Sequence, residues 1–289
     1  MNSAEPISVR TPDGRILSGL SFGPRSGNPV LFMAGAATGK SMHFGADLLR
    51  DMNVRLLTMD RPGMGASTFH RERTLASTAD DYRSFVETTI GRSSSIPVVA
   101  NSQASVFGLA AAADGWASTL VLASPADELA HPQIHEMLPA EATQLSDLAR
   151  ANPREAERVL TMLTPADMES MVLEGASEED RAFYFGDSFL SLYRRALQEG
   201  FEGNGRGYVR DTLIAMRPWG LGLSDIQTTV TILFGAGDLG HSPDHGATLA
   251  ERLVNVRREV LSDAGGALLW THAGRVFETI LGRENLRPD

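Results

Sequence analysis

Short apolar runs recur along the chain and are separated by turns or by helix-like stretches. The runs at 7–10 and 16–22 flank the sequence Thr-Pro-Asp-Gly, a turn signature, and therefore predict a β-hairpin. Further runs are apolar on both faces of the pleat, as strands buried between helices are: 29–33, 56–59, 97–100, 120–123 and 230–234. Their alternation with helical stretches predicts an α/β fold, with a mostly parallel twisted sheet and helices on both faces.

Helical patterns lie between these strands. One helix is expected after Ser41, one at the capping-box pattern that begins at Ser77, and one over the alanine-rich stretch 103–113. Each would cover one face of the sheet and bury its apolar side there.

The pattern changes between Asp127 and Ser224, because strand-like runs vanish and one helix start follows another. We therefore expect a core built from residues 1–126 and 225–289, with residues 127–224 inserted as a helical cap. Such a cap would lie over the carboxyl edge of the sheet, where open α/β sheets bind ligands. Its methionine and aromatic residues are expected to be core residues more than pocket lining: Met162, Met168, Met171, Phe183, Tyr184 and Phe185.

Composition excludes several classes of function. The 289-residue chain has no cysteine, so disulfides, thiolate metal sites and a cysteine nucleophile are excluded. Its formal net charge of −10 makes it a poor partner for nucleic acid or anionic lipid, because phosphates attract Lys and Arg. No apolar run approaches the roughly 20 residues of a membrane helix, and the first ten residues lack the apolar core of a signal peptide. We therefore expect a cytoplasmic protein that binds neither membranes nor nucleic acid.

A candidate nucleophile follows the apolar run at 97–100. Ser102 stands there in the sequence Ala-Asn-Ser-Gln-Ala, at a tight turn between a strand and a helix. A serine at such a junction is exposed above the sheet and lies at a helix N-terminus, where the N–H of Gln103 can stabilise a developing oxyanion. The small residues Ala100 and Ala104 allow the strand and the helix to pack closely. A serine that only caps the helix is the structural alternative.

Several landmarks resemble, in the same order, those of the α/β-hydrolase family, specifically of its small capped members. Residues 33–39 read M-A-G-A-A-T-G and resemble the oxyanion loop after the third strand. This resemblance implies that the backbone N–H of Ala36 acts together with that of Gln103. Residues 60–67 read D-R-P-G-M-G-A-S and match the family's D-x-P-G-x-G-x-S turn, which marks the fold more than the chemistry.

The resemblance also implies an acid and a base. Residues 234–238 read F-G-A-G-D and resemble the turn that carries the acid, which would be Asp238. The family's base is a histidine after the last strand, but the register here puts Gly266 at that position. An unactivated serine is a weak nucleophile, and a general base is worth on the order of 10²–10⁴-fold in rate. A Gly266→His substitution is therefore expected to confer esterase activity on simple aryl esters.

Four explanations of the missing histidine stay open. Another histidine can substitute, and His241 is the best placed because it follows Asp238 by three residues, whereas His43 and His272 are weaker candidates. The substrate can supply its own base in the space that the glycine leaves. The scaffold can instead perform lyase, isomerase or cyclisation chemistry with Ser102 as a hydrogen-bond donor. Finally, the chain can bind a ligand without any chemistry.

The first hypothesis is an enzyme of hydrolase ancestry that acts on a small, apolar ester, thioester or lactone. Ser102 would be the nucleophile or a hydrogen-bond donor, Asp238 the acid, and Ala36 and Gln103 the oxyanion donors. No cofactor or metal is expected, because the two H-x-x-x-H pairs lack the glutamate of H-E-x-x-H and each is interrupted by a proline. The second hypothesis is a non-catalytic ligand-binding relative. Nothing in the sequence indicates an oligomeric state.

Overall fold

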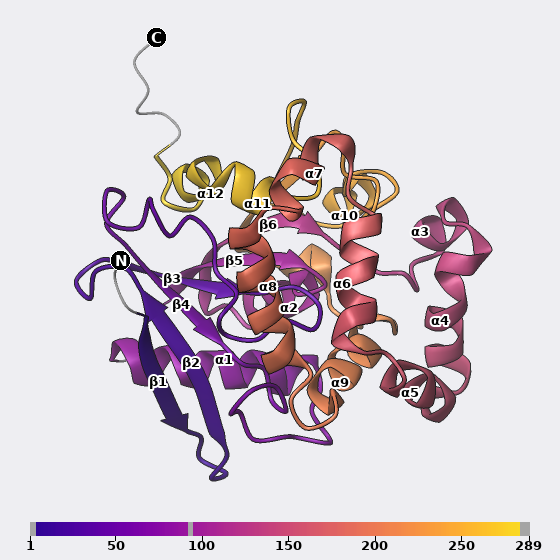
Figure 1. Cartoon of the computed structure of the whole chain (residues 1–289), viewed down its shortest axis with the longest axis horizontal. Helices are drawn as coiled ribbons and strands as arrows, with labels where there is room; N and C mark the ends of the chain where they lie inside the picture. Colours follow the sequence, from indigo (N-terminus) through magenta and orange to yellow (C-terminus); the bar gives the residue numbers. More distant parts are fainter. Residues whose placement is uncertain (1–3, 92–94, 284–289) are drawn as a thin grey trace.

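The computed structural model describes residues 4–91 and 95–283 and contains an eight-stranded sheet in the order β1-β2-β4-β3-β5-β6-β7-β8 (Figure 1). The strands are β1 (Glu5–Arg10), β2 (Ile16–Phe22), β3 (Asn28–Met33), β4 (Val54–Met59), β5 (Ile96–Ser102), β6 (Ala117–Pro125), β7 (Thr229–Gly235) and β8 (Val256–Leu261). The β1–β2 and β2–β4 pairs are antiparallel, and all other neighbours are parallel. The predicted hairpin and the mostly parallel α/β sheet are therefore confirmed.

Two apolar cores cover the two faces of the sheet, because successive residues of a strand point to opposite sides. On β3, Val30 and Phe32 belong to one core, whereas Leu31 and Met33 belong to the other. The first core includes residues of α8 (Asp187–Gly200), α11 (Leu268–Thr271) and α12 (Ala273–Ile280). The second includes residues of α1 (Leu75–Ile90), α2 (Ser105–Ala113) and α10 (Ala247–Glu251). Both faces of the sheet are thus buried against helices, as expected.

A helical insertion, defined here as the segment between β6 and β7, supplies most of the other helices. It contains α3 (Pro132–Met137), α4 (Ala140–Ala151), α5 (Pro153–Thr161), α6 (Pro165–Glu174), α7 (Glu178–Tyr184), α8, α9 (Arg206–Ala215) and the short 3₁₀ helix η1 (Leu223–Asp225). In Figure 1, α6 and α8 run in front of the sheet, and α3, α4 and α5 lie to one side. On α8, Phe189, Tyr193 and Leu197 follow one another at intervals of four residues and are all buried, so one face of this helix packs into the core.

Three local expectations differ from the structure. No helix follows Ser41, because residues 41–53 form a series of turns that passes through positive φ at Gly45 and Asn53. The helix α1 begins at Leu75, two residues before Ser77, because Thr74 is the N-cap and forms the capping box with Ser77. The edge strand β8 was not among the predicted strands, since its three central charged residues interrupt the apolar pattern.

Within the described residues, no helix combines the length and the apolar character that a membrane span requires. Of the core expected from the sequence, residues 1–3, 92–94 and 284–289 lie outside the described part. The parallel strands β3, β5, β6 and β7 run side by side, so their carboxyl ends and the loops that follow them meet at one edge of the sheet. The candidate site lies at this edge.

Candidate active site

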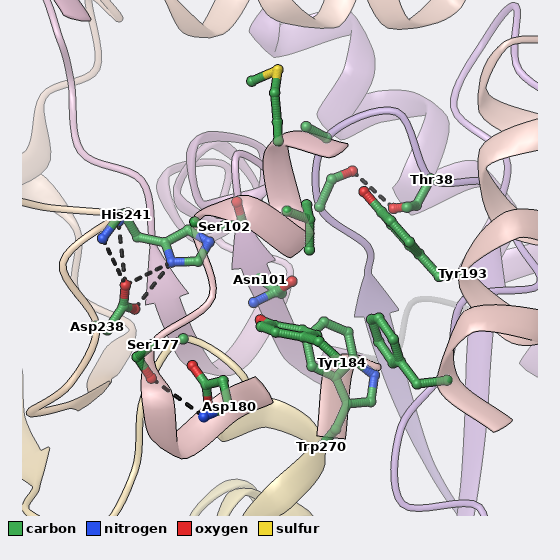
Figure 2. A pocket seen from close by; sticks show the side chains of 18 of the residues that line it. Thr38, Asn101, Ser102, Ser177, Asp180, Tyr184, Tyr193, Asp238, His241 and Trp270 are labelled. Carbon is green, nitrogen blue, oxygen red and sulfur yellow. Dashed lines mark hydrogen bonds and ion pairs between the residues drawn. The ribbon is translucent and has the colours of Figure 1, made fainter. Parts of the chain in front are cut away.

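A pocket of about 300 Å³ lies where the loops after β3, β5, β7 and β8 meet the helical insertion (Figure 2). The β3, β5, β7 and β8 loops contribute Gly35, Ala36, Thr38, Met42, Asn101, Ser102, Gly237, Asp238, Leu239, Gly240, His241, Gly266 and Trp270. The insertion contributes Met168, Met171, Val172, Gly175, Ser177, Asp180, Tyr184, Phe189 and Tyr193. The structure thus brings five of the six predicted site residues to one pocket, while Gln103 is not among the lining residues.

Ser102 occupies the apex of a sharp turn at the end of β5. Its φ of 53° lies in the left-handed region, which is uncommon for a residue other than glycine. The turn is closed by the N–H of Ala104, which donates to the carbonyl of Asn101 at 3.0 Å, and α2 begins at Ser105. Ala100 and Ala104 are both fully buried, which accounts for the small residues on either side of the serine. This is the strand–turn–helix geometry expected for a nucleophile elbow.

The loop after β3 passes directly against Ser102. A Cβ added to Gly35 would lie 3.2 Å from the Cβ of Ser102, so a larger residue there would push the loop away from the serine. The next residue, Ala36, also lines the pocket. Glycine at 35 is therefore what allows the backbone of this loop to approach the candidate nucleophile so closely.

Arg61 determines how this loop is oriented. Its buried guanidinium donates to the carbonyl oxygens of Ala34 at 2.7 Å and Gly35 at 2.9 Å. In a trans peptide the C=O of one residue and the N–H of the next point in opposite directions. The contact with the Gly35 carbonyl therefore turns the N–H of Ala36 away from Arg61. In the sequence, the motif that contains Arg61 indicates the fold, but nothing in it predicts the contact between Arg61 and the Gly35 carbonyl.

The charge of Arg61 is compensated by a buried ion-pair group. Asp211 on α9 accepts short hydrogen bonds from both Arg61 and Arg73, and all three side chains are at most 1% exposed. Two guanidinium groups and one carboxylate leave this group with one excess positive charge close to the loop of Gly35.

The two candidate oxyanion donors are supported from the same helix. Gln103 donates its side-chain Nε2 to the hydroxyl of Thr212 at 3.2 Å, and Thr212 follows Asp211 on α9. Among the described residues, the backbone N–H groups of Ala36 and Gln103 have no hydrogen-bond acceptor. Ala36 lines the pocket, whereas Gln103 does not.

Asp238 and His241 form the most informative contact in the pocket. The Nδ1 atom of His241 lies 3.0 Å from each carboxylate oxygen of Asp238, and the backbone N–H of His241 donates to Oδ1 at 3.3 Å. A carboxylate only accepts, so Nδ1 carries the proton and Nε2 of the neutral ring is the acceptor. Figure 2 shows the ring between the Asp238 carboxylate and Ser102. The sequence-predicted substitute base is therefore oriented by the predicted acid.

Burial and pairing act in opposite directions on this pair. Burial of each group disfavours its charged form, but the attraction between Asp238 and His241 outweighs it, so the pKa of Asp238 lies below its ordinary value and that of His241 above. The structure contains no hydrogen bond between the Ser102 hydroxyl and His241, although both are described residues. Catalytic hydrogen bonds of unliganded sites are commonly long and tighten only when substrate binds.

Gly266 lies beside this pair. A Cβ added there would be 3.5 Å from Cε1 of His241 and 3.5 Å from Oδ1 of Asp238. A methyl group would therefore fit, but an imidazole extending toward Asp238 would overlap the ring of His241. The space of the expected histidine is occupied by a histidine from another loop. This geometry removes the reason for expecting that Gly266→His, made alone, would create the base.

The weaker histidine candidates lie outside the pocket. The ring of His43 stacks on Phe22, and its Nδ1 contacts the carbonyl of Ser41 at 2.8 Å. His272 is the N-cap residue of α12, and its Nε2 lies 3.5 Å from the carboxylate of Asp263. Neither residue lines the pocket, so the two fail the geometric test for a base.

The insertion contributes more to the pocket than the sequence suggested. Of the six residues expected in the core, Met168 and Tyr184 are buried and Phe183 packs against the core, but Met162, Met171 and Phe185 are exposed, so the expectation was wrong for these three. Met168, Met171 and Tyr184 line the pocket together with the buried Asp180. In the sequence, Asp180 belongs to an acidic stretch after Ser177 that is typical of a helix start. Acidic residues are common in the first turn of a helix, so three in succession were the only feature of the sequence that could have drawn attention to Asp180. Among the described residues, no group of three or more carboxylates or imidazoles is arranged to hold a metal ion.

No protein-family model and no curated protein matches the chain. Solved structures do match. A hydrolase from Pseudomonas aeruginosa PA01 is 17% identical, with a TM-score of 0.71 over 97% of this chain and 100% of that chain. A thermophilic esterase from Thermogutta terrifontis is 18% identical, with a TM-score of 0.68 over 96% and 97%. An enol-lactonase from Burkholderia xenovorans LB400 is 16% identical, with a TM-score of 0.66 over 96% and 99%.

At these identities the similarity bears on the fold alone. It extends over nearly the whole of each chain. Together with the strand order and the turn at Ser102, these matches show that the chain has the α/β-hydrolase fold.

Proposed function

We propose that this chain is a serine hydrolase that cleaves small, neutral, largely apolar esters, with thioesters and lactones as related substrates. Ser102 is the nucleophile, His241 the general base and Asp238 the acid. The backbone N–H groups of Ala36 and Gln103 bind the oxyanion. The observation that carries the proposal is the contact of the His241 ring with Asp238, in the pocket that also contains the strained Ser102.

In this proposal the proton of the Ser102 hydroxyl passes to Nε2 of His241 while Oγ attacks the carbonyl carbon. The carbonyl electron pair moves onto the oxygen, which the two N–H groups stabilise, and Asp238 stabilises the imidazolium. The tetrahedral intermediate then expels the alcohol, which takes its proton from His241, and leaves an acyl-serine. Water attacks the acyl-serine with the same base, releasing the carboxylic acid and restoring Ser102.

The pocket lining supports a neutral, apolar substrate. Aromatic and methionine side chains form much of its wall: Met42, Met168, Met171, Tyr184, Phe189, Tyr193 and Trp270. None of the lining residues is a lysine or arginine, whereas two are aspartates, Asp180 and Asp238. A carboxylate or phosphate on the substrate would find no cationic partner and would be repelled.

We propose further that the helical insertion acts as a cap. Nine of its residues line the pocket, and α7 and α8 supply aromatic side chains that pack on Trp270 from the β8 loop. Walls of this kind exclude water from the reacting carbonyl and so strengthen the electrostatic interactions inside.

The proposal is tested by removing the imidazole at residue 241 and introducing one at residue 266. His241→Ala should lower kcat for 4-nitrophenyl butyrate by about 10²–10⁴-fold and suppress fluorophosphonate labelling of Ser102. In the double variant His241→Ala/Gly266→His the new imidazole can occupy the vacated space beside Asp238, so activity should recover at least tenfold over the single variant. Circular dichroism and melting temperature report whether each variant is folded.

Two controls complete this test. Ser102→Ala should abolish labelling, and Gly266→His alone should give no gain in activity because His241 blocks the approach to Asp238. Full activity of folded His241→Ala would contradict the assigned base. A wild-type protein that is neither labelled nor active on any ester would support the non-catalytic ligand-binding relative instead.

A further inference from the structure

The pocket contains a second buried carboxylate that the proposed triad does not use. Asp180 is the third residue of α7, is only 3% exposed and lines the pocket although it belongs to the helical insertion. Carboxylates are rarely buried to this degree unless something compensates them. The groups around Asp180 therefore indicate what it does.

The glycine pair 265–266 makes room for Asp180. A Cβ added to Gly265 would lie 2.3 Å from Oδ2 of Asp180 and 2.6 Å from the hydroxyl of Ser177, so these two side chains would have to move away from the loop. Gly265 has no positive φ, so backbone conformation does not account for the glycine. The absence of a side chain at 265 allows α7 to bring its carboxylate against this loop.

Asp180 also approaches the proposed base. The Cβ position of Gly266 lies 3.6 Å from Oδ2 of Asp180, 3.5 Å from Cε1 of His241 and 3.5 Å from Oδ1 of Asp238. Two carboxylates and one imidazole therefore surround the Cβ position of Gly266. One carboxylate comes from the loop that carries His241, and the other comes from the insertion.

We propose that Asp180 is a positioning residue of the catalytic site: it joins the helical insertion to the loop of Gly265 and Gly266 and stabilises the protonated form of His241. This inference rests on the proposed function, because it assigns Asp180 a role through the base. The insertion then contributes to catalysis as well as to the pocket wall, since it carries one of the two charges that face the imidazolium.

The charges around His241 agree with this role. Asp238 faces it from its own loop, Asp180 from α7, and Glu179 of α7 lies near the same loop, 3.0 Å from a Cβ added to Gly237. Burial lowers the pKa of His241, whereas Asp238 most strongly, and then Asp180, raise it. Burial raises the pKa of Asp180 as well, and hydrogen bonds from the backbone of Ala267, the Ser177 hydroxyl and the Gly266 backbone oppose this.

The test neutralises Asp180 without changing its shape. For Asp180→Asn, kcat/KM measured against pH with 4-nitrophenyl butyrate should show its acid limb about 0.5–1 pH unit lower than the wild type. The kcat plateau should fall about tenfold, as it does when partners that orient catalytic groups are removed, while KM changes less than about twofold because the apolar wall is intact. The matched control is Glu178→Gln, an exposed carboxylate on the same helix, which should leave the profile unchanged.

A second variant covers the case in which Asp180→Asn does not fold. Gly265→Ala keeps the charge but displaces it, because the added methyl group would collide with Oδ2 of Asp180. It should shift the acid limb in the same direction. A folded variant of either kind with an unshifted limb would overturn the role of Asp180.

The two proposals fail in different ways. If His241→Ala keeps its activity, the proposed function is wrong whatever Asp180 does. If His241→Ala is inactive and Asp180→Asn retains the wild-type limb and plateau, the triad stands and the role of Asp180 is wrong.

Discussion

The nucleophile side and the base side of this pocket are built in different ways. Ser102 and the loop of Gly35 extend from β5 and β3, in the middle of the sheet, and rest on the fully buried Arg61. The base side lies toward the edge strand β8, whose residues are only half-buried or exposed. There His241 stands on a surface loop, with a quarter of its side chain exposed.

The proposed nucleophile and the proposed base therefore depend on the fold to different degrees. In this fold the proposed nucleophile lies on a strained backbone turn between a strand and a helix, so its sequence position is tied to the fold. The base needs only its ring in one place. A ring can reach that place from more than one loop; in the proposed site it comes from residue 241, and residue 266 is glycine.

The strongest test of this contrast is a substitution under the nucleophile side. Arg61→Met should lower the free energy of unfolding by about 3–5 kcal/mol, because it breaks a buried ion-pair group and frees the carbonyls of Ala34 and Gly35. It should also lower kcat by about 10²-fold or more as the N–H of Ala36 loses its orientation. Urea unfolding and steady-state kinetics measure the two effects.

The matched substitution on the base side is His241→Ala, which should cost about 1–2 kcal/mol of stability, because the buried Asp238 loses its imidazole partner but keeps the backbone N–H bonds from residues 240 and 241. Arg61→Lys keeps the charge without the planar fork and should fall between the two variants. Equal losses of stability for Arg61→Met and His241→Ala would mean that the two sides do not differ in the way described.

The pH profile sharpens the contrast next. The base must be neutral to accept the Ser102 proton, and the pKa of His241 is raised by Asp238 against the effect of burial. Activity should therefore fall about tenfold for each pH unit below a midpoint that lies above the ordinary histidine value of about 6.5. Measured kcat/KM between pH 5 and 9 gives this limb, and a flat profile would contradict a titrating base.

The smallest expected effect concerns the support of the second oxyanion donor. Thr212→Val removes the hydroxyl that accepts from Gln103 and leaves that amide without its partner. We expect a loss of about 1 kcal/mol in unfolding free energy and a fall in kcat of less than about tenfold, since the backbone N–H itself remains. Thr212→Ser retains the hydroxyl and should behave as the wild type. A larger loss in Thr212→Val than in Arg61→Met would reverse the assignment of the main support.

The sheet and the elbow were predictable for a shared physical reason. Strand 16–22 was predicted with its observed bounds, and the turn at Ser102 was expected from a strand that runs directly into a helix. These signals are local, because apolar spacing and small residues act over a few positions. The missed strand β8 and the absent helix after Ser41 show where the local pattern fails. Charged residues in an edge strand interrupt the apolar pattern by which a strand is predicted, and a segment of successive turns can have the residue pattern of a helix.

The base and its surroundings could not be decided in this way. From the sequence, His241 was one of several candidate bases, and Gly266 was the position at which the expected histidine is missing. Their relation depends on the place that one imidazole ring takes among residues 180, 238 and 266, which lie on different elements. The sequence by itself determined the α/β sheet, the position of the serine and a short list of histidines. Only the tertiary structure decided which histidine meets Asp238 and which residue of the insertion stands beside it, because both follow from packing between distant segments.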